Sequence, residues 1–270
     1  MLESPLEAVG MVCYSLPGEN ANEMTKKDIP DLELLEENAW LTDHIINAVQ
    51  SLLAKQFQVS GLCDTLIVAD WSTKLNSGHE KFVQIVHVHD PSALHWIAIT
   101  NMGSRPNAVK VYCSLIKKPS DKCLQHIFYF VNCQVSELTV EIMNVGKQKG
   151  CADCGLFAVA YAEILLSGRD PTTVILYQSS ISQHLKDCLL NGFLSPFPLL
   201  SHRAVRRPLV TKYVVRLYCT CRTNSYKSDN MVQCDACREW YHKSCVSLDD
   251  DTFAMLSHDK AREHRCSRCM

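Results

Sequence analysis

The feature that most constrains this chain is a set of eight cysteine and histidine residues that come in four close pairs near its C-terminus. The pairs are Cys219 with Cys221, Cys234 with Cys237, His242 with Cys245, and Cys266 with Cys269. Thiolate and neutral imidazole are ligands that suit Zn²⁺, and one tight turn that carries a close pair supplies half of a tetrahedral site. Eight ligands therefore predict two zinc ions. A segment of about fifty residues buries too little apolar surface to fold alone, so we expect metal binding to drive its folding.

The order of these ligands, with Trp240-Tyr241 just before the histidine, resembles the PHD-type zinc finger family over residues 218–269. The resemblance implies cross-braced ligation, in which alternate pairs share one metal ion. One zinc ion would be held by Cys219, Cys221, His242 and Cys245, and the other by Cys234, Cys237, Cys266 and Cys269. A RING finger also cross-braces two zinc ions, but its usual order places the histidine earlier. Many PHD fingers carry a tryptophan where this chain has His264.

Electron-rich side chains beside the ligands are candidates for binding a histone tail. The face of an aromatic ring attracts a quaternary ammonium group from which water is excluded. In PHD fingers that bind trimethyl-lysine, the cage positions match Tyr218, Met231 and Trp240 of this chain, and Ser225 or Tyr226 is a candidate for a further wall. The resemblance thus predicts a reader of a histone tail, with methyl-lysine as the favoured ligand. Binding of an unmodified tail and a purely structural role are the alternatives.

The rest of the chain has the composition of a folded protein, with 47% apolar and 21% charged residues. A net charge of -2 offers no general attraction to nucleic acid, so direct DNA binding is not expected despite the cluster Arg203, Arg206 and Arg207. The chain lacks a secretory signal and any run of eighteen apolar residues, which predicts no membrane contact. Together with the finger, these features predict a nuclear protein whose other eight cysteines are reduced.

Hydrophobic periodicity predicts a larger domain ahead of the finger. Helices are expected over 40–57, 155–166 and 180–190, with Thr42 and Asp43 as candidate caps of the first. Short strands are expected over 65–69, 82–88, 96–100 and 109–112. The expected organisation is a poorly ordered lead-in over 1–32, a folded domain over 33–200, a linker over 201–216 and the zinc finger over 217–270.

Cys154 is the candidate nucleophile of the larger domain. It stands at the start of an apolar helix, where the helix dipole and free amides favour a thiolate. His95, just before an apolar strand, is a candidate base, and Gln148 is a candidate donor to a developing oxyanion. His87 and His89 are alternative bases, although neither precedes a tryptophan.

The segments Trp40-Leu41-Thr42-Asp43, His95-Trp96, Gln148 and Asp153-Cys154-Gly155 together resemble the SUMO- and ubiquitin-like-specific cysteine proteases over about 33–200. The resemblance implies a papain-like α+β fold that cleaves after a C-terminal Gly-Gly, with the ring of Trp96 covering the channel for those glycines. Where the family carries an aspartate that orients the histidine, this chain has Cys113. A thiol is a weak acceptor and does not stabilise imidazolium as a carboxylate does.

Because Cys113 stands where the family carries the orienting aspartate, two functions remain open for this domain. One is a thiol peptidase acting on a ubiquitin-like protein or its conjugates, with Asp90, Asn101 or Ser114 as candidate substitutes for the missing aspartate. The other is a catalytically inactive domain that binds histones through the finger and a ubiquitin-like protein through the protease-like surface.

Overall fold

The computed structural model describes most of two folded units. The described residues are 29, 31–36, 39–66, 75–76, 81–90, 93–115, 123–124, 127, 131–132, 136–203, 210–222, 230–258 and 263–270. The helices are η1 (Leu32–Leu35), α1 (Asp43–Phe57), α4 (Cys154–Leu166), η2 (Pro171–Thr173), α5 (Gln178–Asn191), η3 (Ser244–Val246) and α6 (Asp250–His258). The strands are β1 (Ser60–Gly61), β2 (Leu75–Asn76), β3 (Phe82–Asp90), β4 (Ala93–Thr100), β5 (Ala108–Tyr112), β6 (Val131–Asn132), β7 (Glu137–Met143), β8 (Val174–Leu176), β9 (Leu199–His202), β10 (Val210–Arg216), β11 (Met231–Gln233) and β12 (Trp240–His242).

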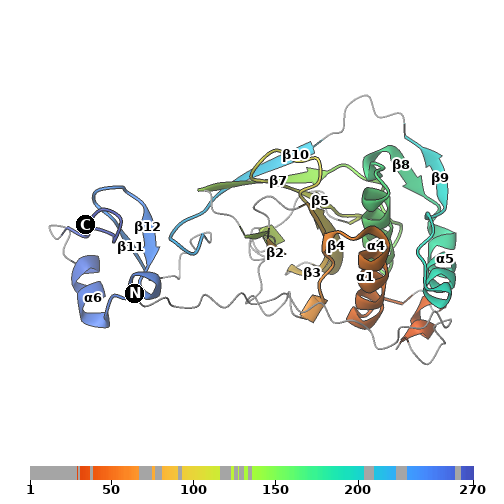
Figure 1. Ribbon diagram of the computed structural model, residues 1–270, viewed down its shortest axis with the longest axis horizontal. Helices are drawn as coiled ribbons and strands as arrows, with labels where there is room; N and C mark the ends of the chain where they lie inside the picture. Colours follow the sequence, from red (N-terminus) through yellow and green to blue (C-terminus); the bar gives the residue numbers. More distant parts are fainter. Residues whose placement is uncertain are drawn as a thin grey trace, which may run out of the picture.

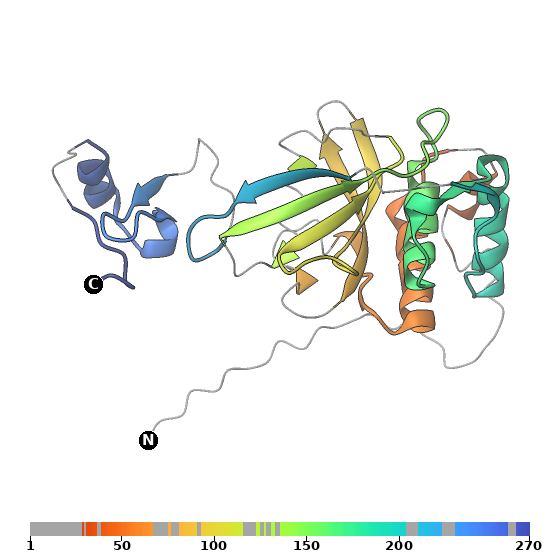
Figure 2. The ribbon, with the colours of Figure 1, turned by 90° about the horizontal axis from the view of Figure 1, so that it is seen from above.

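A six-stranded mixed sheet forms the centre of the larger unit, in the order β1-β3-β4-β5-β7-β10. Strand β4 is antiparallel to β3 and β5, whereas β7 is parallel to β5 and antiparallel to β10. Helices α1 and α4 lie on one side of this sheet, and α5 lies outside α4 (Figures 1 and 2). The small C-terminal unit lies away from these helices and has its own two-stranded sheet, β11 and β12 (Figure 1). The predicted α+β domain followed by a small separate unit is confirmed.

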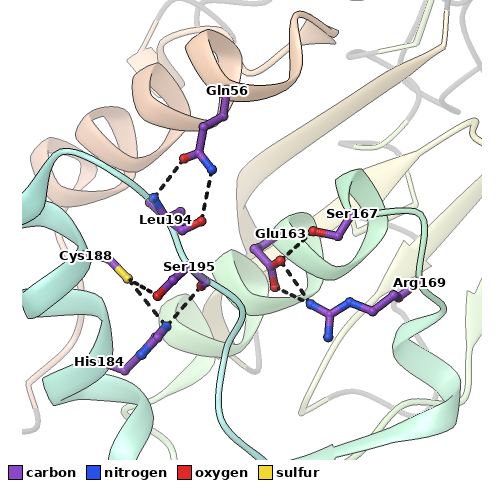
Figure 3. Close-up of polar contacts among 8 residues, drawn as sticks. All are labelled: Gln56, Glu163, Ser167, Arg169, His184, Cys188, Leu194 and Ser195. Carbon is purple, nitrogen blue, oxygen red and sulfur yellow. Dashed lines mark hydrogen bonds and ion pairs between the residues drawn. The ribbon is translucent and has the colours of Figure 1, made fainter.

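Helix α4 passes through the middle of the larger core. Nearly all of its residues are buried, so it has no polar face. The prediction of a buried helix over 155–166 is confirmed. The side chain of Glu163 is the exception to its apolar character, and it is satisfied by Arg169 and Ser167, which both donate to it at 2.6–3.0 Å (Figure 3).

Helix α1 confirms the helix expected from residue 40 onward, although it begins at Asp43. Thr42 occupies the N-cap position, but its side chain does not cap the helix. Its hydroxyl instead donates to Asp31 Oδ2 at 3.0 Å. This bond holds the segment before α1 against the start of η1, so Thr42 stabilises tertiary rather than helical structure.

Three sequence expectations differ from the structure. Thr65 and Leu66, expected in a strand, lie in a helical turn. Ile29 and Leu32, placed in the lead-in, are buried in the core with α1 and α4 because their apolar side chains extend that core. The expected linker 201–216 contains strand β10, which pairs along its whole length with β7. The features that favour a linker, Pro208 and the cluster of Arg203, Arg206 and Arg207, all precede this strand.

Strand β10 also joins the two units directly. Only Leu217 and Tyr218 separate its last residue from Cys219. Leu217 is buried in the core of the larger unit, and its backbone N–H donates to Ser136 O at 2.7 Å. Cys219, the first metal ligand of the small unit, therefore lies two residues after Leu217, which is fixed in the core of the larger unit. In the described part of the chain, no helix is long and apolar enough to span a membrane.

Candidate active site and zinc centres

The small unit brings its eight cysteine and histidine ligands into two groups of four. One group is Cys219, Cys221, His242 and Cys245, and the other is Cys234, Cys237, Cys266 and Cys269. Within each group the donor atoms lie within 4.8 Å of one another. This is the alternating arrangement that the family resemblance implied, since pairs one and three form one group and pairs two and four form the other.

The distances within each group fit a tetrahedral zinc ion. A Zn–S bond of about 2.3 Å gives sulfur atoms at two corners of a tetrahedron a separation of about 3.8 Å. Cys237 Sγ and Cys266 Sγ are 3.9 Å apart, too far for a disulfide, and Cys221 Sγ lies 3.2 Å from His242 Nδ1. The backbone N–H of His242 donates to Cys219 Sγ at 3.4 Å, and that of Cys266 to Cys234 Sγ at 3.3 Å. Such bonds stabilise thiolates, so both groups fit Zn²⁺.

The two-stranded sheet separates the core of the finger from its outer face. Val232 and Tyr241 are paired across β11 and β12 and are buried between the metal groups. Met231 and Trp240 stand at alternate positions, on the same face as His242; Trp240 is 39% exposed, whereas Met231 is half-buried against the core of the finger. Of these two predicted cage residues, Trp240 is therefore the accessible one. Tyr218 lies beside β10, with the guanidinium group of Arg216 5.5 Å from its ring centre, and Ser225 lies outside the described residues.

In the larger unit, the topology gathers the predicted catalytic residues at one end of the sheet. Since β4 is antiparallel to β5 and β5 is parallel to β7, the start of β4 meets the ends of β5 and β7. His95 and Trp96 lie near the start of β4, and Cys113 follows β5. The loop from β7 to α4 carries Gln148 at the same end, and Cys154 is the first residue of α4.

Cys154 is a buried thiol at the junction of β4 and α4. The backbone N–H groups of Trp96 and Gly155 donate to its sulfur. These bonds favour the thiolate, but burial opposes it more strongly and raises the pKa of the Cys154 thiol above its ordinary value. In the resting protein, burial therefore outweighs the effect of the helix N-terminus on this thiol. Cys113 interacts electrostatically with Cys154, which places the two thiols in one neighbourhood.

Gln148 is tied to the end of β5 by a hydrogen bond that the sequence analysis missed. Ser114, almost completely buried, donates its hydroxyl to Gln148 Oε1 at 2.5 Å. Next to this pair, Lys147 Nζ donates to the backbone oxygen of Cys113 at 2.8 Å. Because the carboxamide oxygen of Gln148 is occupied, its NH₂ group is the part left to act as a donor. This NH₂ group also contacts Gly150 O at a longer 3.2 Å.

Trp96 fixes the segment before α1 to this end of the sheet. Its indole N–H donates to Leu41 O at 2.9 Å, and the ring is buried. Leu41 also packs on Gly155, where an added Cβ would come within 2.9 Å of the leucine side chain. The resemblance segments around residues 40, 96 and 155 therefore meet in space, and Gly155 is required for the close approach.

The alternative bases and orienting groups are placed differently. His87 is paired opposite Trp96 across the strands, with ring centres 4.7 Å apart. Asn101 follows β4, at the far end of the sheet from His95, and accepts from Phe82 N at 2.8 Å. It is therefore excluded as a substitute for the orienting aspartate. The side chains of His89 and Asp90 lie outside the described residues.

A second cysteine and histidine pair lies on α5, but its geometry is structural. Cys188 Sγ is 3.5 Å from His184 Nε2 and 3.4 Å from Ser195 Oγ (Figure 3). His184 Nε2 also lies 3.1 Å from Ser195 O, which can only accept, so this nitrogen carries its proton. A protonated nitrogen cannot take the proton of Cys188. The pair closes the turn after α5 instead of activating a thiol.

The small unit matches known zinc fingers. Residues 217–270 match the family model described as Pygopus, PHD-type zinc finger. The chain is 46% identical over 37 residues to lysine-specific demethylase phf2 of Danio rerio and 39% identical over 44 residues to chromatin remodeling protein EBS of Arabidopsis thaliana. The matches cover 14% and 16% of this chain, but only 4% and 19% of those two proteins. Residues 217–270 are therefore a PHD-type zinc finger, as the ligand order predicted.

The larger unit has structural relatives of low sequence identity. One is the C-terminal Ulp1 protease domain in complex with Smt3, the yeast ortholog of SUMO, with 14% identity, a TM-score of 0.45, and coverage of 66% of this chain and 90% of that one. Another is the Xanthomonas campestris effector XopD bound to ubiquitin, with 17% identity, a TM-score of 0.38, and coverage of 55% and 91%. At these sequence identities, the structural similarities do not indicate whether the larger unit has enzymatic activity.

Proposed function

We propose that this chain is a chromatin-associated thiol peptidase: its PHD-type finger, holding two zinc ions, binds a histone tail, and its larger domain cleaves after the Gly-Gly of a ubiquitin-like protein. The observation that carries the peptidase function is the meeting of Cys154, Gln148 and the end of β5 at one end of the sheet. The finger would hold the enzyme near conjugates on the same nucleosome and so raise their effective concentration. This function places the protein in the nucleus.

The catalytic step begins from a neutral thiol. Burial keeps Cys154 protonated at rest, so His95 removes the proton as the sulfur attacks the scissile carbonyl, and no thiolate forms beforehand. The NH₂ group of Gln148, oriented by Ser114, donates to the oxyanion that develops on the carbonyl oxygen. His95 then gives the proton to the leaving amine, and water releases the acyl group from Cys154. With Cys113 in place of a carboxylate, the imidazolium of His95 receives less stabilisation, which predicts a slow enzyme.

A cleavage assay tests this step. A ubiquitin-like protein with an extension after its Gly-Gly is incubated with the zinc-loaded full chain, and the products are read by intact mass. Cleavage by the wild type and none by Cys154→Ala is the expected result. Cys188→Ala is the matched control, because Cys188 is also buried and lies beside His184. Cleavage by Cys154→Ala at the rate of the wild type would show that Cys154 is not the nucleophile.

The histone-reading function rests on the accessible face of the finger. The relatives named above are a lysine demethylase and a chromatin remodeling protein, and residues 217–270 match the PHD-type finger model. On this face, Trp240 and Met231 offer an aromatic ring and a polarizable thioether to a methylated ammonium. Tyr218 and Ser225 complete the proposed cage. A tail peptide would use the same face whether or not its lysine is methylated.

Calorimetric titration with histone tail peptides tests this binding. Trp240→Ala should weaken binding of a trimethyl-lysine peptide about tenfold, the loss expected from one partly desolvated cation–π contact. Met255→Ala is the matched control, because Met255 is 43% exposed on α6 of the same finger. Equal losses of affinity in both variants would show that Trp240→Ala acts by general destabilisation of the finger. Equal affinity of the wild type for methylated and unmethylated peptides would show that the finger binds the tail without recognising methylation.

A second candidate function follows from Cys113 and the raised pKa of Cys154 together. A thiol that stays protonated, together with a histidine that lacks an orienting carboxylate, is typical of a domain that has lost catalytic activity. Such a domain can still retain the surface on which its former substrate docks. In that case the larger domain binds a ubiquitin-like protein reversibly. Absence of cleavage with retained binding of the same protein would favour this function.

A further inference from the structure

Two cysteines flank the turn that leads into α4. Cys151 and Cys154 are separated by only two residues, and they differ in accessibility, since Cys151 is exposed and Cys154 is 2% exposed. Neither the finger nor the proposed catalytic step uses Cys151. We infer that Cys151 and Cys154 form a reversible disulfide when the protein meets a peroxide, and that this bond blocks the sulfur of Cys154.

The turn that carries these residues is closed by a single side chain. Gln178, the first residue of α5, donates its Nε2 to Lys149 O at 2.8 Å and to Asp153 Oδ2 at 2.5 Å. Its Oε1 accepts from Lys149 N at 2.8 Å. One carboxamide thus holds both ends of the segment 149–153, and Gly150, with φ at 77°, permits the reversal between them.

The chain bends at residues 149–152, just before α4 begins at Cys154. Three residue steps of extended chain would separate their Cα atoms by about 10 Å, whereas a disulfide needs about 4.4–6.8 Å. Asp153 already accepts the first hydrogen bond of α4, from Phe157 N at 3.0 Å, so the chain is helical immediately after the turn. Because the segment bends instead of extending, the two Cα atoms lie closer than in an extended chain, which favours a bond between these cysteines.

The difference in exposure sets the order of the chemistry. The exposed thiol of Cys151 reacts first: its sulfur attacks hydrogen peroxide, the O–O bond breaks, and a sulfenic acid and one water form. The sulfur of Cys154 then attacks the sulfenic sulfur, expelling a second water and forming the S–S bond. Overall, two thiols and one peroxide give one disulfide and two waters. A dithiol reductant reverses the reaction by exchange.

Two other fates of these thiols lead to different products. A metal ion is not favoured, since in the described part of the chain the four-ligand groups are the two in the finger. Cys113 is the competing partner of Cys154, because the two thiols interact electrostatically. A Cys113–Cys154 bond would join two distant peptides, whereas a Cys151–Cys154 bond lies within one. The products therefore identify the partner.

Peptide mapping after oxidation provides the test. The zinc-loaded full chain is treated with hydrogen peroxide, alkylated and digested with trypsin, which releases residues 150–169 with Cys151 and Cys154 as their cysteines. We expect this peptide to be unalkylated and lighter than its dithiol form by two hydrogens, about 2 Da, and dithiothreitol to restore two alkylation sites. Cys113→Ser should behave as the wild type. Cys151→Ser should lose the disulfide and instead add oxygen to Cys154.

The inference fails if the wild type adds oxygen to Cys154 as fast as Cys151→Ser does, or if Cys154 is found joined to the Cys113 peptide. This mass readout does not depend on enzymatic activity. Only the functional consequence, loss of Cys154 reactivity toward a substrate-like electrophile after oxidation, rests on the proposed function. A disulfide in a protein that cleaves nothing would therefore refute the peptidase and leave the oxidation site standing.

Discussion

Removal of one zinc ligand should unfold the finger and leave the larger domain intact. In the described part of the finger, the buried apolar side chains outside the ligands are Val232 and Tyr241. At roughly 1.5–3 kcal/mol each, their burial contributes about 3–6 kcal/mol, whereas a structural zinc ion contributes about 10–16 kcal/mol of folding free energy. Metal binding therefore dominates. Because ligands of the two groups alternate along the chain, loss of Cys237 should disrupt both groups, not one.

Zinc content and limited proteolysis of Cys237→Ala measure this effect. The wild type should carry two zinc ions per chain, and the variant fewer than one, with new cleavage sites between residues 217 and 270. Cys151→Ala is the matched control, since Cys151 is also exposed but lies outside the finger. A variant that keeps one tightly bound zinc ion and a protease-resistant finger would refute the cross-braced dependence, and zinc loss in Cys151→Ala would refute the ligand assignment.

Three further predictions concern the larger domain. Trp96→Phe leaves Leu41 O without its buried donor and should lower the free energy of unfolding by about 1–3 kcal/mol; an unchanged urea midpoint would contradict this. Burial raises the pKa of Cys154, so its thiolate increases with pH, and iodoacetamide alkylation should keep accelerating beyond about pH 8.5; a plateau below that pH would show a lowered pKa. Ser114→Ala releases Gln148 and should lower kcat about tenfold to a hundredfold with KM unchanged; a change in KM alone would assign Ser114 to substrate binding.

The zinc centres could be predicted from sequence because their chemistry is local. Each close pair, such as Cys234 with Cys237, can be recognised by residue type and spacing, and the grouping of pairs follows from the family resemblance. The buried helix α4 was also predictable, since an uninterrupted apolar segment has no other stable location in a folded domain.

The features that sequence analysis missed depend on contacts between distant residues. Ser114 and Gln148 are 34 residues apart, and nothing in either neighbourhood indicates that a hydroxyl meets a carboxamide. The expected linker does not foresee strand β10, because the pairing of β10 with β7 joins segments that are distant in sequence. The sequence likewise indicates the helix N-terminus at Cys154, but not the packing of distant residues around its thiol, whose burial raises the pKa of Cys154.

The most direct test of the central claim is the reaction of the zinc-loaded chain with ubiquitin-like proteins that carry an electrophile after Gly-Gly, read by intact mass. A working nucleophile at Cys154 predicts a covalent adduct with at least one probe, absent in Cys154→Ala and retained in Cys188→Ala. No adduct with any probe, from a folded sample that still binds a histone peptide, would contradict the peptidase and leave a binding protein.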